Sequence, residues 1–119
     1  MAANHSMSQH SVLTRAKKRH AYACVQANRI GEALGLYQQI CAVDPEDAES
    51  WFMVGTLYGR MGRIADAETS LRKAVALLPN FAQGHLNLGQ VLELQDKFAA
   101  AEECFRRAVA LKADLAEGH

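Results

Sequence analysis

Apolar residues recur at helical spacing in the middle of the chain. One side of a helix is formed by four residues at i, i+3, i+4 and i+7: Trp51, Val54, Gly55 and Tyr58. A second apolar stripe follows over residues 64–75, after a break at residues 61–63. Pro79 ends this second helix because proline lacks the amide hydrogen that the helix needs. Residues 48–79 therefore predict two helices, and the small Gly55 lets them pack closely.

The same pattern returns at a period of 34 residues. The run Arg-Lys-Ala-Val-Ala-Leu at 72–77 reappears as Arg-Arg-Ala-Val-Ala-Leu at 106–111, and Pro45 precedes Pro79 by one period. A fixed period of this length is typical of repeat proteins, in which each unit packs on its neighbours. Three units are predicted, over about 14–47, 48–81 and 82–115.

The residues of the central unit resemble the tetratricopeptide-repeat (TPR) family. Its signature residues are Trp51, Val54-Gly55, Tyr58, Ala67, Leu71 and Pro79. The resemblance covers residues 14–119 and implies an all-α fold, a right-handed α-solenoid of three antiparallel helix hairpins. Six helices are expected, at about 12–27, 30–43, 47–61, 63–77, 81–95 and 98–111.

The two ends of the chain lie outside the three predicted units. Residues 1–11 are polar and aperiodic, so we expect a disordered lead-in before a TPR domain at 12–119. Residues 116–119 repeat the Ala-Xaa-Gly-His sequence of 82–85 and predict the start of a fourth repeat. We therefore expect part of a longer array that self-associates through an apolar surface at its C-terminal end. That surface is predicted to include Cys104, Phe105, Ala108 and Leu111.

Composition sets limits on partner and compartment. Thirteen basic residues balance thirteen acidic ones, so the overall charge does not indicate nucleic acid or an anionic membrane. The longest apolar run, 74–78, is too short to span a bilayer, and the N-terminus lacks the apolar core of a signal peptide. Cys24, Cys41 and Cys104 stand in helical segments, where small hydrophobic residues are expected. Cysteines used this way favour a reducing cytoplasm.

A basic cluster at residues 15–20 is the densest charged segment. It would suit a phosphate, an acidic peptide or nucleic acid, but no aromatic residues interleave it as single-strand binding would require. We favour a solvated face of a terminal helix, and nucleic-acid binding is the least favoured function. On this interpretation, reversing the charges of Lys17 and Lys18 changes stability little.

Catalysis and metal binding find little support in the sequence. The paired carboxylates at 46–47 and 102–103 lack an apolar cleft that would separate their pKa values, and no phosphate loop or nucleophile elbow is present. The histidines form no evident ligand set, so no metal and no cofactor is expected. His85 takes the place of Trp51 in its repeat and is expected to pack with a satisfied ring nitrogen. We predict that the chain is not an enzyme.

A ligand-binding groove is predicted on the first helix of each repeat, opposite the signature stripe. The TPR resemblance places these residues on the concave face: Arg15, Lys18, Arg19, Tyr22, Glu49, Phe52, Met53, Thr56, Arg60, Gln83, Leu86, Asn87 and Gln90. Phe52, Met53 and Leu86 are candidate anchors for an extended segment or helix. The alternative is that they pack on the first helix of the next repeat.

Two ligand-binding modes of TPR proteins each match this stripe at a single residue. The carboxylate clamp for chaperone C-termini would be met only at Lys18, and the asparagine ladder of the O-linked sugar transferase array only at Asn87. We therefore expect a non-catalytic scaffold that binds a protein or peptide in its groove. The alternative is an N-terminal targeting or substrate-recruiting segment of a larger enzyme, such as a glycosyl- or sulfotransferase.

Overall fold

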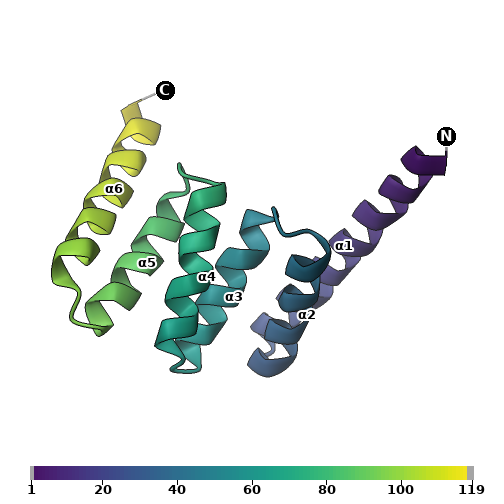
Figure 1. Cartoon of the computed structure of the whole chain (residues 1–119), viewed down its shortest axis with the longest axis horizontal. Coiled ribbons are helices and arrows are strands. Elements are labelled where there is room, and N and C mark those ends of the chain that lie inside the picture. Colours follow the sequence, from purple (N-terminus) through teal and green to yellow (C-terminus); the bar gives the residue numbers. More distant parts are fainter. Residues whose placement is uncertain (1, 118–119) are drawn as a thin grey trace.

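Six α-helices in three antiparallel hairpins make up the described chain. A computed structural model describes the backbone of residues 2–117 and the side chains of residues 12–114. Its helices are α1 (Ala2–Gln26), α2 (Ile30–Val43), α3 (Ala48–Arg60), α4 (Ile64–Leu77), α5 (Ala82–Leu94) and α6 (Phe98–Glu117). The hairpins α1–α2, α3–α4 and α5–α6 stand side by side in chain order (Figure 1). The predicted all-α solenoid is confirmed.

The first and last helices are longer than the sequence predicted. The helix α1 begins at Ala2, where we expected a disordered lead-in over 1–11, because no glycine or proline interrupts the segment. Likewise, α6 continues to Glu117 instead of ending near 111. Residues 112–115 have no counterpart of Pro79, so nothing stops the helix there. The predicted fourth repeat therefore falls partly within α6, and its residues 118–119 lie outside the described chain.

The turn inside each hairpin has one residue in the left-handed backbone conformation, and this residue stands at the same position in each repeat. Asn28, Gly62 and Asp96 have φ values of 62°, 80° and 62°. The next residue donates its amide hydrogen back to the helix, as in the 2.9 Å bond from Arg63 N to the Tyr58 carbonyl. This is a Schellman motif, which satisfies the last carbonyls of a helix and needs a residue that tolerates positive φ. Glycine, asparagine and aspartate are such residues.

Glycines allow the closest helix contacts within the second and third hairpins. A Cβ atom on Gly55 would lie 2.6 Å from Leu71 Cγ, and one on Gly89 would lie 2.6 Å from Phe105 Cε1. Both distances are shorter than van der Waals contact, so the helix pairs α3–α4 and α5–α6 approach as they do only because glycine is present. The predicted role of Gly55 is confirmed.

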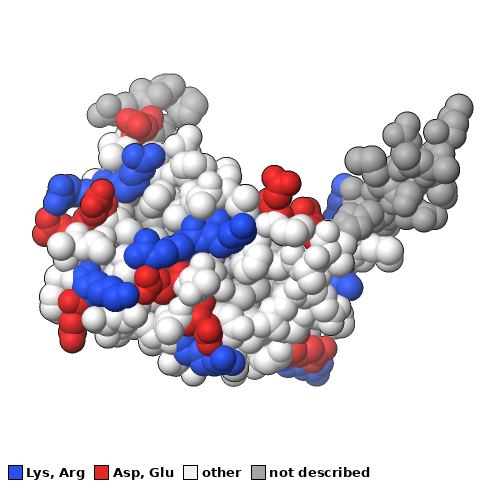
Figure 2. Space-filling model, in the orientation of Figure 1, with Lys and Arg blue, Asp and Glu red and all other residues white. Residues whose placement is uncertain are grey.

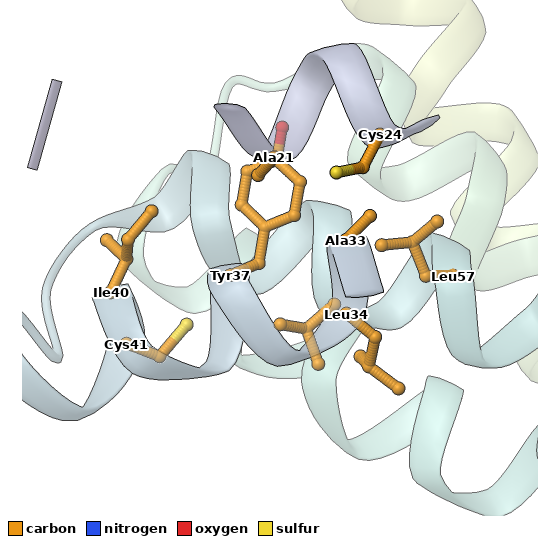
Figure 3. Close-up of a cluster of buried hydrophobic side chains, with 9 residues drawn as sticks. Ala21, Cys24, Ala33, Leu34, Tyr37, Ile40, Cys41 and Leu57 are labelled. Atoms are coloured by element: carbon orange, nitrogen blue, oxygen red, sulfur yellow. The ribbon is translucent and has the colours of Figure 1, made fainter. Parts of the chain in front are cut away.

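The hydrophobic core connects hairpins as well as helices within a hairpin. One buried cluster takes residues from α1, α2 and α3, including Cys24, Tyr37 and Leu57 (Figure 3). A second cluster, which includes Leu71 and Leu92, takes residues from α4, α5 and α6. Each hairpin therefore buries its apolar side partly against the next hairpin, as in other solenoids.

Among helices that are two apart in the chain, the backbones of α3 and α5 approach each other. In the described chain the backbones of α1 and α3, of α2 and α4, and of α4 and α6 do not. The helices α2 and α4 lie in front of α1 and α3 in Figure 1. The first helices of the second and third repeats therefore adjoin on the side where the groove is predicted.

The surface expected at the C-terminal end is only partly open. Ala108 is 2% exposed, so its assignment to an uncovered surface was wrong: it packs within the α5–α6 hairpin. Cys104, Phe105 and Leu111 are half-buried, and Phe105 lies against Gly89. The most exposed apolar side chain here is instead Val109, at 67%.

Candidate functional site

Six of the predicted groove residues line one pocket between α1, α2 and α3. The pocket has a volume of about 360 Å³ and is lined by Arg15, Lys18, Arg19, Tyr22, Tyr37, Glu49 and Met53. Three cationic side chains and two phenol rings thus surround it, with one carboxylate opposite. A pocket of this composition suits an anionic group attached to an apolar or aromatic body.

Lys18 is held in place by two carboxylates. Its Nζ lies 2.8 Å from Asp47 Oδ2 and 3.0 Å from Glu49 Oε1. Partial burial works to lower the pKa of Lys18, but its hydrogen bonds to Asp47 and Glu49 outweigh burial, and the pKa is raised. Lys18 is therefore a charged link between α1 and the start of α3, in contrast to the solvated face predicted for the basic cluster. Arg15 and Arg19 also line the pocket and are exposed.

Tyr37 is a lining residue that the sequence did not reveal. Its side chain is 3% exposed and belongs to the first core cluster, yet it also lines the pocket from α2. Burial raises the pKa of the Tyr37 phenol, with Glu49 the next contribution, so its hydroxyl stays protonated at neutral pH. The helical spacing of Tyr37 indicates only that it points inward. It reaches the pocket because α2 packs beside α1 and α3.

Polar groups continue the groove from α3 to α5. Asn87 Nδ2 donates to Thr56 Oγ1 at 3.2 Å, and Gln83 Nε2 donates to Asn87 Oδ1 at 2.8 Å. This short chain of amide and hydroxyl groups joins two repeats on the concave side. Such groups can also bond the backbone of an extended peptide.

The candidate apolar anchors serve mainly in packing. Phe52 packs against the second core cluster and meets the ring of Phe81 edge-on, with 4.7 Å between centroids. Met53 packs against the first cluster while also lining the pocket. The alternative stated for these residues, packing on the first helix of the next repeat, describes Phe52, whose cluster includes Leu88 and Leu92 of α5. It does not describe Met53, whose cluster belongs to α1, α2 and α3. Leu86 is half-buried.

Besides Phe52, three predicted groove residues belong neither to the pocket nor to the polar chain from α3 to α5. Arg60 and Gln90 are exposed on α3 and α5, and neither lines the pocket, nor does Leu86. The predicted stripe thus divides into a basic pocket at α1 and an amide-rich segment at α5.

His85 behaves as its repeat position predicts. Its Nε2 lies 2.8 Å from the Pro79 carbonyl oxygen, just as Trp51 Nε1 donates to the Pro45 carbonyl at 2.8 Å. Both rings tie the start of a first helix to the proline that ends the preceding one. The prediction of a packed histidine with a satisfied ring nitrogen is confirmed.

One side-chain cluster contradicts our reading of the histidines. His20 and Cys24 stand four residues apart on α1, and Glu32 of α2 faces them. Their ligand atoms all lie within 4.8 Å of one another. The i, i+4 spacing of His20 and Cys24 is visible in the sequence, whereas the approach of Glu32 depends on how α1 and α2 pack.

The opposite face of the array carries mixed charges. Figure 2 shows Lys and Arg side chains interleaved with Asp and Glu on the face turned to the viewer, where α2 and α4 lie in front. Several of these form ion pairs, including Glu68 with Arg72 and with Lys97. No helix within residues 2–117 is long and apolar enough to cross a membrane.

The three helix hairpins, stacked in chain order, define a tetratricopeptide-repeat protein. More closely, the chain belongs to the family described as the middle TPR-like domain of cilia and flagella-associated protein 70, whose sequence model matches residues 18–119. No match was found among curated protein sequences.

Solved structures share the fold at low sequence identity. The second TPR domain of Spaghetti (RPAP3), bound to the HSP90 peptide SRMEEVD, has a TM-score of 0.83 at 16% identity, over 89% of this chain and 98% of that one. MamA gives 0.81 at 19% identity, over 87% of this chain and 61% of MamA. An O-GlcNAc transferase of Thermobaculum terrenum gives 0.82 at 27% identity, over 87% of this chain but 20% of the transferase. The chain thus spans less than two thirds of MamA and of the transferase.

Proposed function

We propose that the chain is a non-catalytic scaffold that binds an acidic, extended protein segment along its concave groove. The observation that carries the proposal is the basic pocket, in which six groove residues predicted from sequence meet. An acidic side chain or carboxylate would enter between Arg15 and Arg19, and the peptide backbone would continue past Thr56 toward Asn87.

The binding mode differs from a carboxylate clamp. Of the residues such a clamp uses, this chain offers Lys18, and Asp47 and Glu49 already neutralise its charge. The two exposed arginines therefore carry the recognition we propose. Arginine also suits this role because its planar fork matches a carboxylate in two hydrogen bonds.

The test is a binding measurement with a panel of synthetic peptides. A fluorescent, acidic, aromatic-containing peptide library and its Asp/Glu→Asn/Gln counterpart are titrated with the chain, using anisotropy. Arg19→Glu should weaken binding of an acidic hit by about 1–3 kcal/mol, and Tyr22→Ala should also weaken it. Lys73→Glu, an exposed charge reversal on α4, is the matched control. Equal binding by Arg19→Glu and wild type would overturn the proposal.

A second candidate is a recruiting segment of a larger enzyme. The similarity to the Thermobaculum terrenum O-GlcNAc transferase supports it, because there a comparable array forms part of an enzyme. The coding sequence that follows residue 119 discriminates the two: a catalytic domain there would favour recruitment. Peptide binding by the groove is expected in both cases.

Two further expectations accompany the scaffold. We propose that Val109 on the outer side of α6 contributes to self-association. We also propose a reducing compartment, the cytoplasm, because Cys24 and Cys41 are buried free thiols. Burial raises the pKa of Cys41 to about 11, so this thiol stays protonated and unreactive at neutral pH.

A further inference from the structure

We propose that His20, Cys24 and Glu32 form a three-ligand site for a divalent transition metal, with zinc the best match, that joins α1 to α2. One imidazole, one thiol and one carboxylate supply nitrogen, sulfur and oxygen ligands of the types that zinc binds. This site is separate from the basic pocket, and its existence does not depend on the proposed function.

The arrangement of the three side chains is close to what a tetrahedral ion needs. His20 Nε2 lies 3.4 Å from Glu32 Oε2, and all three ligand atoms fall within 4.8 Å of one another. Ligand atoms around tetrahedral zinc are about 3.3–3.7 Å apart. The histidine and carboxylate therefore already have a suitable separation, and small side-chain rotations would bring in the sulfur.

Each ligand is held by the fold in a way that favours a single site. His20 and Cys24 share a helix face because they are four residues apart. Cys24 is 4% exposed and belongs to the first core cluster, which fixes its sulfur at the boundary of the apolar interior (Figure 3). Glu32 is placed opposite by the first turn of α2.

The site is open to solvent on one side. The side chains of His20 and Glu32 are 59% and 47% exposed, so an ion has a route of entry and a fourth position for water. A thiolate and a carboxylate would balance the charge of a divalent ion. Arg29 Nη1 lies 3.9 Å from Glu32 Oε1, which opposes the ion's charge but also orients the carboxylate.

Repeat geometry explains why the first hairpin alone has this site. His20 corresponds to Val54 and Leu88, which are each 3% exposed because they pack against the second helix of the preceding hairpin. Position 20 instead carries an imidazole whose side chain is 59% exposed. The first repeat therefore has a histidine that can bind a metal ion at a position that is buried in the later repeats.

The test is a titration of the whole chain, reduced and freed of metal, with Co²⁺. Wild type should bind one Co²⁺ and develop thiolate-to-cobalt charge-transfer absorption together with the visible bands of a tetrahedral ion; Zn²⁺ should abolish both. Cys24→Ser should remove the charge-transfer absorption. His20→Gln and Glu32→Gln should each weaken binding about tenfold or more. Cys41→Ser and Cys104→Ser should retain the wild-type spectrum.

Because the sulfur of Cys24 is buried, a folding defect in Cys24→Ser would also remove metal binding. A thermal measurement on variants of other residues therefore tests the site independently. Zn²⁺ should raise the melting temperature of wild type and of His85→Gln but not of His20→Gln. The His20 side chain is 59% exposed, so its replacement leaves the core intact. Failure of wild type to bind Co²⁺ would overturn the proposal. So would a charge-transfer band that survives in Cys24→Ser or disappears in Cys104→Ser.

Discussion

At the scale of single residues, position in the repeat decides what a side chain does more than its chemical type. The basic cluster on α1 illustrates this. From the sequence, Lys18 was a groove residue in a basic cluster for which a solvated face was favoured. In the structure it is 29% exposed and forms ion pairs with Asp47 and Glu49, across the junction of the first two repeats. Its charge therefore contributes to stability as well as to the pocket.

We predict that Lys18→Glu destabilises the chain by about 1–2 kcal/mol, because it removes two ion pairs and adds a third carboxylate beside Asp47 and Glu49. Urea unfolding followed by circular dichroism measures the change. Lys18→Met, which keeps the apolar stem, should cost less. Lys73→Glu, exposed on α4, should stay within about 0.5 kcal/mol. Equal stability of Lys18→Glu and Lys73→Glu would show that the ion pairs of Lys18 do not stabilise the fold.

Residue roles that depend on the periodic pattern could be predicted from sequence. His85 was expected to replace Trp51, and both rings indeed bond a proline carbonyl. Roles that depend on contacts between repeats could not. Phe52 was a candidate anchor because it lies opposite the signature stripe of its helix, whereas in the structure it packs against the core cluster of α4, α5 and α6 and against the ring of Phe81.

At the scale of helices and turns, the junction between the second and third hairpins has its own polar clamp. Glu68 of α4 accepts hydrogen bonds from Arg72 on the same helix and from Gln95 and Lys97 in the turn before α6. Only 15% of the Glu68 side chain is exposed. The hydrogen bonds from Arg72 and Gln95 are the main causes that lower its pKa from 4.5 to about 2.

This shift predicts an acid-dependent stability. Since the pKa of Glu68 is lower in the folded chain than in the unfolded one, its contribution is complete above pH 4.5 and is lost as the pH falls toward 2. Allowing for partial solvent screening, we expect about 1–2 kcal/mol from this residue at pH 7.

The measurement compares wild type with Glu68→Gln by urea unfolding between pH 7 and pH 2. The difference in unfolding free energy should be greatest at neutral pH and should shrink as the pH drops below 4.5. Glu93→Gln, an exposed substitution on α5, serves as the control. A difference between wild type and Glu68→Gln that is independent of pH would refute the clamp.

At the scale of the whole molecule, the 34-residue period was sufficient to predict three hairpins, and the TPR resemblance added the prediction of a groove on the first helices. The period reports which residues each unit buries, and a solenoid simply repeats that arrangement. It does not report where neighbouring units leave space. The basic pocket needs Tyr37 from α2 beside residues of α1 and α3, and the metal cluster needs Glu32 beside α1. Both sites depend on how adjacent helices are packed together.

The outer side of α6 gives the last prediction. One and two repeats earlier, the counterparts of Val109 are Val75, which is half-buried, and Cys41, which is 6% exposed, because the next hairpin covers them. Val109 itself is 67% exposed. We expect it to be covered by a second copy of the chain at high concentration, since exposed apolar surface favours association. Sedimentation equilibrium over a concentration series should detect dimers, and Val109→Glu should shift the equilibrium toward monomer. The control is Ala110→Glu, an exposed substitution one position further along α6, which should shift the equilibrium less. A wild-type chain that remains monomeric at every concentration would remove self-association from the proposed properties.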